Sequence, residues 1–137
     1  MARGRLTGGG SLVLDSQGLS LYLNEDRMVM NMVRSAVDRG ADRVVSGATL
    51  IEAQHGGIKR ARWNYVLSQL RVEALSVGWA KEAAQLLQET GLHGHKYALD
   101  AMVAVTAMHQ PGPVVMLTSD VDDMAKLCGP RVTLVAV

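Results

Sequence analysis

The sequence of 137 residues contains no phenylalanine and only one cysteine, Cys128. A single cysteine cannot form an internal disulfide bond or a cysteine-based zinc site. We therefore expect a fold held by its apolar core and a reducing, cytoplasmic setting. Aromatic residues make up 4% of the chain and are scattered along it. This distribution argues against a base-stacking platform of the RNA-recognition-motif type, which needs clustered aromatic side chains.

Long apolar runs and an excess of one charge are also missing. No stretch approaches the roughly 18 consecutive apolar residues of a membrane-spanning helix, so we expect no membrane association. The first ten residues contain two arginines but lack the apolar region of a secretory signal. The chain has 14 basic and 13 acidic residues. That balance does not indicate a histone-like or a strongly acidic partner surface.

What is present predicts one globular domain. Hydrophobic residues make up 48% and charged residues 20% of the chain, an ordinary balance for a folded protein. Residues 1–10, MARGRLTGGG, are predicted to form a flexible basic arm rich in glycine, and residues 11–137 the folded domain. The glycines precede a predicted strand and no lysine follows them, so a phosphate-binding loop is not indicated.

Short apolar runs alternate with segments of helical periodicity along the domain. The predicted strands cover residues 11–14, 43–46, 72–77, 114–117 and 132–137. The predicted helices cover residues 16–23, 28–37, 46–54, 59–70, 79–90, 98–109 and 120–127, with a loop at 92–97. Alternating strands and helices predict an α/β fold with a parallel sheet covered on both faces. Ligands of such sheets bind beyond the carboxyl ends of the strands.

Four acidic residues are predicted to meet at that edge of the sheet. Asp15 and Asp120 directly follow predicted strands, and Glu52 and Asp100 are expected in the first turns of helices. Each one alone is equally explained as a helix cap or an exposed position. Together they would repel one another unless a cation bound them. Carboxylate oxygens without histidine or cysteine point to Mg²⁺ or Mn²⁺.

The segments LVLDS, TLIEAQHGG, ALDAMVAVTA and LTSDVDDMAKL, in this order, resemble those of the PIN-domain nucleases, and among them the VapC-like toxins. The resemblance implies a three-layer α/β/α fold with a central parallel sheet of four to five strands. It also implies a Mg²⁺ or Mn²⁺ site and cleavage of single-stranded RNA. The RNA substrate is expected to be single-stranded or structured. The sequence departs from the family at Met124, where an aromatic residue is common, and in its basic arm.

By match of position, the resemblance assigns the site residues. The catalytic acids are Asp15, Glu52, Asp100 and Asp120. The metal ligands are Asp15, Asp100, Asp120 and Asp123, the last from a Thr-x-Asp-x-x-Asp pattern that begins at Thr118. Glu52 either binds the metal or positions the attacking water. Asp122 is expected to be a solvated neighbour.

Further candidates surround these acids. Hydroxyl groups could orient the carboxylates by hydrogen bonding or simply cap helices; they belong to Ser16, Ser46, Thr118 and Ser119. The candidate substrate contacts are Lys59, Arg60, Arg62 and His95, for which a solvated surface position is an equally good explanation.

Two functional hypotheses remain. The first is a metal-dependent endoribonuclease, the toxin of a pair that a cognate antitoxin protein neutralises. The second is a non-catalytic RNA- or protein-binding module that keeps the metal site. An aspartyl-phosphate phosphatase is disfavoured because Asp15 is followed by Ser-Gln and not by an Asp-x-Asp pair. The methionine-rich segment 28–37 predicts either a homodimer interface or a helix packed wholly on its own sheet.

Overall fold

A computed structural model describes residues 9–137 of the chain. Five strands lie in this part: β1 (Ser11–Leu14), β2 (Asp42–Ser46), β3 (Arg71–Glu73), β4 (Val114–Thr118) and β5 (Val132–Ala136). The helices are α2 (Ser16–Leu23), α3 (Arg27–Asp38), α4 (Gly47–Ala53), α5 (Arg60–Ser68), α6 (Val77–Thr90), α7 (Gly94–Met108), α8 (Val121–Cys128) and the short 3₁₀ helix η1 (Gly129–Arg131). Within residues 9–137, none of the helices is both long and apolar enough to cross a membrane.

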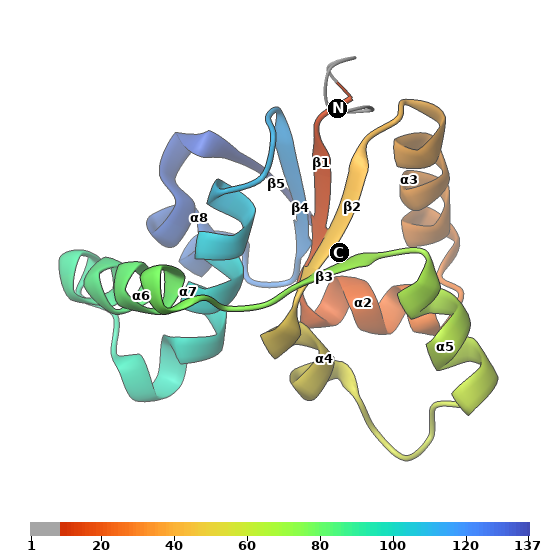
Figure 1. The fold of residues 1–137 in the computed structure, drawn as a ribbon, viewed down its shortest axis with the longest axis horizontal. Coiled ribbons are helices and arrows are strands. Elements are labelled where there is room, and N and C mark those ends of the chain that lie inside the picture. Colours follow the sequence, from red (N-terminus) through yellow and green to blue (C-terminus); the bar gives the residue numbers. More distant parts are fainter. Residues whose placement is uncertain (1–8) are drawn as a thin grey trace.

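The strands form one sheet in the order β3-β2-β1-β4-β5, and all neighbours are parallel. Helices lie on both sides of the sheet, with α2, α3 and α5 on one side and α6, α7 and α8 on the other (Figure 1). The predicted α/β class and the parallel, three-layer architecture are therefore confirmed. Since the strands are parallel, the carboxyl ends of β1, β2 and β4 meet at one edge.

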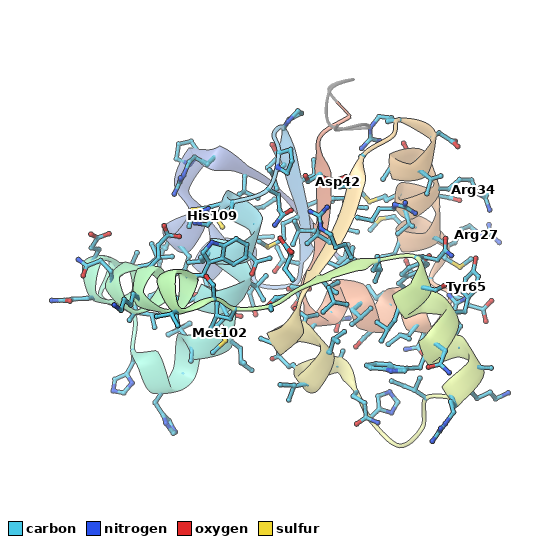
Figure 2. The ribbon with its side chains drawn as sticks, in the orientation of Figure 1. Arg27, Arg34, Asp42, Tyr65, Met102 and His109 are labelled. Carbon is cyan, nitrogen blue, oxygen red and sulfur yellow. The ribbon has the colours of Figure 1, made fainter. Side chains whose placement is uncertain are left out.

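Alternating side chains of the central strands supply two cores. Leu12 and Leu14 of β1 pack with α2 and α3, whereas Val13 faces the opposite layer and packs with α7 and α8. This two-sided burial explains the nearly continuous apolar strand sequences. In the layer of α6 and α7, the ring of Trp79 on α6 stacks on the ring of His109, the residue that follows α7. The two ring centroids lie 4.8 Å apart. His109, labelled in Figure 2, also lies 2.6 Å from the carboxylate of Glu82.

The predicted arm over residues 1–10 falls mainly on residues 1–8, which lie outside the described part of the chain. Gly9 and Gly10 are described, and Gly10 has a positive φ of 73°. A Cβ atom at Gly10 would lie 2.3 Å from the carbonyl oxygen of Pro113. Glycine is therefore required at the start of β1, where Ser11 donates a backbone hydrogen bond to the same oxygen at 3.0 Å.

Two predicted elements are wrong in extent. The strand expected over 72–77 covers Arg71–Glu73, because the side chain of Ser76 accepts a hydrogen bond from the N–H of Trp79 and starts α6. Of the loop expected over 92–97, only residues 92 and 93 lie outside a helix, because α7 already begins at Gly94. His93 caps this helix by accepting a bond from the N–H of His95 at 3.3 Å, and imidazole is not among the usual cap groups.

Helix α3 confirms the predicted amphipathic pattern but buries only part of its apolar surface. Val29, Val33 and Ala36 lie in the core. Met28 and Val37 remain 46% and 47% exposed. The stripe therefore packs on its own sheet in the centre and leaves apolar side chains at both ends of the helix in contact with solvent.

Candidate functional site

Asp15 stands at the carboxyl end of β1 and is held by hydrogen bonds on both carboxylate oxygens. It is the N-cap of α2, where Oδ1 accepts from the N–H of Gly18 at 2.9 Å. Its Oδ2 accepts from the N–H of Ser119 at 3.3 Å, beyond the end of β4. The side chain is 5% exposed. Burial raises the pKa of Asp15 above its usual value, and hydrogen bonds from Thr118, Gly18 and Ser119 partly offset that effect.

The turn after β4 places a second acid beside the first. The hydroxyl of the buried residue Thr118 accepts a hydrogen bond from the N–H of Asp120 at 2.9 Å and also bonds the carboxylate of Asp15. Asp120 is the N-cap residue of α8, but its side chain makes no capping bond and is exposed. The capping explanation therefore fails for Asp120, whereas it holds for Asp15.

Glu52 and Asp100 lie elsewhere in their helices than the sequence suggests. Glu52 is the next-to-last residue of α4, since that helix begins at Gly47 with Ser46 as its cap. Asp100 lies past the first turn of α7, since that helix begins at Gly94. The prediction of first-turn positions is wrong for both, and favourable contact with the positive end of a helix explains neither acid. Glu52 is exposed and Asp100 is half-buried.

The electrostatics of Asp100 show that the acids converge. Its pKa is raised from 3.8 to about 6, first by burial and then by repulsion from Asp120, Glu52, Asp123 and Asp15, in that order. Repulsion of this kind requires the other carboxylates to lie close in space. Asp122 is not among them. The structure thus places the other four predicted acids, from the cap of α2, from α4 and from the start of α8, within electrostatic range of Asp100 on α7.

The chemistry of these acids suits a divalent cation, although their side chains are not arranged as a complete metal site. All five donors are carboxylates, the hard ligands that Mg²⁺ and Mn²⁺ prefer. Among residues 9–137, no three acidic, histidine or cysteine side chains stand in a group that would hold a metal ion. Glu52 and Asp120 are exposed, so rotation of their side chains is not hindered by packing. Binding would require such a rotation and would relieve the repulsion.

The four hydroxyl candidates divide by position. Thr118 and Ser119 contact Asp15 directly, the first through its hydroxyl and the second through its backbone N–H. The hydroxyl of Ser46 accepts a bond from the N–H of Ala48 and caps α4. Ser16 is half-buried as the first residue of α2. Thr118 is therefore the hydroxyl that orients a carboxylate of the cluster.

The substrate candidates divide in a similar way. Arg62 donates hydrogen bonds to the carbonyl oxygens of Leu23 and Tyr22 at the end of α2, at 3.1 and 2.5 Å. Its guanidinium also lies over the rings of Tyr22 and Tyr65. We therefore correct its assignment from a phosphate contact to a structural link between α2 and α5. Lys59, Arg60 and His95 are exposed.

Sequence reasoning missed a pocket between α4 and α5. It has a volume of about 420 Å³ and is lined by the segment from the end of α4 to the first turn of α5, including Gln54, His55, Arg60, Trp63 and Asn64. Its residues come from one stretch of the chain, QHGGIKRARWN. The signal available in the sequence was a tryptophan close to two residues with side-chain amides and to basic residues.

No protein-family model and no curated protein matches the chain. Among solved structures, it is similar to a chain of the "Crystal structure of VapBC2 from Rickettsia felis bound to a DNA fragment from their promoter". The TM-score is 0.66 and the sequence identity 17%, over 92% of this chain and 98% of the other. The similarity shows that the two chains share their α/β fold almost from end to end.

Proposed function

We propose that the protein is an endoribonuclease that uses Mg²⁺ or Mn²⁺ to hydrolyse phosphodiester bonds of single-stranded RNA. The observation that carries this proposal is the convergence of five carboxylates at the carboxyl edge of a parallel sheet, with the pKa of Asp100 raised to about 6. A protein that places unpaired like charges together loses stability. A bound divalent cation would remove that cost, and the fold matches a chain of a VapBC2 complex.

In this proposal Asp15, Asp100, Asp120 and Asp123 hold the cation. When bound, it supplies Lewis-acid chemistry at the scissile phosphate. Asp15 is buried and is the most rigid of these ligands, because each of its carboxylate oxygens accepts a backbone hydrogen bond and the hydroxyl of Thr118 adds another. Glu52, exposed at the end of α4, is free to orient the attacking water and to take up its proton.

The same fold similarity supports one protein partner, and the exposed side chains of α3 suggest another. The similar structure contains VapBC2 with promoter DNA. By analogy, we propose that this chain is the toxin of a pair and that an antitoxin protein neutralises it. We also propose a homodimer that uses α3, whose Met28 and Val37 expose apolar surface.

The test is cleavage of a 5′-labelled single-stranded RNA by the purified chain. With Mn²⁺ we expect internal cleavage products, which EDTA abolishes and Asp120→Asn does not produce. Asp122→Asn is the matched control and should cleave as the wild type does, since Asp122 is exposed and is not among the acids that raise the pKa of Asp100. Cleavage that persists in EDTA would refute the metal requirement.

The second candidate is a non-catalytic module that binds RNA or protein and keeps the metal site without turnover. The specific observation in its favour is that the ligands do not stand ready for catalysis, since no three ligand side chains among residues 9–137 are already grouped for a metal. This candidate predicts RNA binding without product at any Mn²⁺ concentration. The cleavage assay therefore decides between the two.

A further inference from the structure

We infer that the pocket between α4 and α5 binds one nucleobase of the RNA strand, next to the phosphate that the acidic cluster attacks. This inference rests on the proposed function and adds a base-binding subsite to it. The pocket is open, with a volume of about 420 Å³. Its lining supplies an aromatic ring, two side-chain amides, an imidazole and a guanidinium, a set of groups that suits a nucleotide.

Trp63 provides the stacking surface. Its side chain is half-buried, because it packs against the core formed with α2 and α3 while it also lines the pocket. A ring fixed in this way loses little conformational freedom when a base stacks on it. Stacking of a base on an aromatic side chain contributes about 1–3 kcal/mol and accepts any base, since every base has a π-face.

Polar groups around the ring can bind the edge of the base. Within residues 9–137, the amides of Gln54 and Asn64 make no hydrogen bond, and each amide offers both donors and an acceptor. The Nδ1 atom of His55 accepts a bond from the N–H of Gly57 at 3.1 Å. Its proton is therefore on Nε2, which makes this nitrogen a donor. Arg60 is exposed at the start of α5 and can contact the phosphate of the same nucleotide.

The position of the pocket connects it to the acids. Gln54, which lines the pocket, is the C-cap residue of α4, the helix that carries Glu52. Helix α4, the segment that leads to α5 and the start of α7 lie at the same edge of the sheet (Figure 1). Lys59 and Arg60 add positive charge to this side, whereas Arg62 is engaged with the end of α2. In this proposal, an RNA strand whose phosphate lies at the cluster places a neighbouring base on Trp63.

Tryptophan fluorescence tests the pocket without RNA cleavage. The chain has two tryptophans, so Trp79→Phe leaves Trp63 as the only one. In EDTA, adenosine 5′-monophosphate and a short oligoadenylate should quench this fluorescence, whereas ribose 5-phosphate should not. Asn64→Ala in the same background should weaken binding about tenfold, in line with the loss of base contacts. Asn31→Ala, an exposed asparagine on α3, is the matched control and should bind unchanged.

The two proposals fail separately in these assays. Metal-dependent cleavage without quenching by any nucleotide would overturn the base pocket alone, and quenching without cleavage would overturn the nuclease alone. Equal quenching by ribose 5-phosphate, or equal affinity of Asn64→Ala and the parent, would also overturn the pocket. Trp63→Leu should abolish binding measured by anisotropy of a labelled oligoadenylate, and circular dichroism checks that this variant is folded. If Trp63→Leu unfolds, the Asn64→Ala comparison decides.

Discussion

The carboxylate of Asp15 accepts a hydrogen bond from the backbone N–H of Ser119, a residue 104 positions later in the chain. This contact ties the carboxyl ends of β1 and β4, which pair directly in the sheet. The hydroxyl of Thr118 adds a second link to the same carboxylate. Asp15, which follows β1, and the turn that carries Asp120 are therefore held together, and the remaining acids belong to α4, α7 and α8.

Asp15→Asn should abolish RNA cleavage and leave the fold intact. Asparagine retains an oxygen that can cap α2, but it lacks the charge that a cation needs. We expect cleavage to fall by at least about a hundredfold, measured with labelled RNA in Mn²⁺, and a circular dichroism spectrum like that of the wild type. Asp26→Asn is the matched control, because Asp26 caps α3 with the same geometry outside the cluster. Normal cleavage by Asp15→Asn would remove Asp15 from the site.

The stability of the metal-free protein should fall as the pH rises from about 4 to 6. The pKa of Asp100 is about 6 in the folded protein, whereas the ordinary value for an aspartate, which we take for the unfolded chain, is 3.8. The folded state therefore binds more protons in this range, and deprotonation costs it free energy. Asp100→Asn should flatten this dependence and raise the free energy of unfolding by ~1–2 kcal/mol at pH 7.

Urea unfolding in EDTA at several pH values measures this effect. Asp122→Asn is the control and should keep the dependence of the wild type. A pH profile that is identical in Asp100→Asn and the wild type would contradict the crowding of charge around Asp100.

Added Mn²⁺ should raise the melting temperature, since the cation binds the folded state and not the unfolded chain. At a concentration of one hundred times the dissociation constant, the gain is about 2.7 kcal/mol, or roughly 10 °C for a domain of this size. Asp100→Ala should lose most of this increment, and Asp122→Ala should retain it. Differential scanning calorimetry gives the comparison, and an equal shift in Asp100→Ala and the wild type would place the cation elsewhere.

Arg62→Ala should lower the free energy of unfolding by ~1–2 kcal/mol, because it removes hydrogen bonds to two carbonyl oxygens at the end of α2. Arg60→Ala should change stability by less than about 0.5 kcal/mol, since Arg60 is exposed. For RNA binding we expect the reverse, with a larger loss of affinity in Arg60→Ala than in Arg62→Ala. Denaturant unfolding and filter binding of the two variants check both effects, and a larger loss of binding in Arg62→Ala would restore it as a phosphate contact.

Light scattering should give a mass of about twice 14.7 kDa at micromolar concentration. Met28→Lys should yield a folded monomer, because Met28 is 46% exposed at the start of α3. Met32→Lys, in contrast, should unfold the chain, since Met32 packs against the core. Ile51→Lys, at an exposed position of α4, is the control and should remain dimeric. A monomeric wild type would refute the homodimer.

Local signals in the sequence determined most of the fold. Strands of apolar residues, helical periodicity and caps act over a few neighbouring residues, and so they located the strands β1, β2, β4 and β5 and most helices. They failed where the signal was unusual, as at His93, which caps α7 with an imidazole. The strand ends also placed Asp15 and Asp120 correctly at one edge of the sheet, because parallel strands share that edge.

Only the tertiary structure decided how the site is assembled. Glu52 and Asp100 reach the cluster from the end of α4 and from within α7, which no local pattern indicates. Arg62 looked like a member of a basic surface cluster, but packing of α5 on α2 turns it toward two carbonyl oxygens. Charge repulsion and burial depend on distances through space between residues far apart in the chain. For that reason the sequence by itself determined which acids to consider, and the packing of the helices on the sheet decided which of them interact.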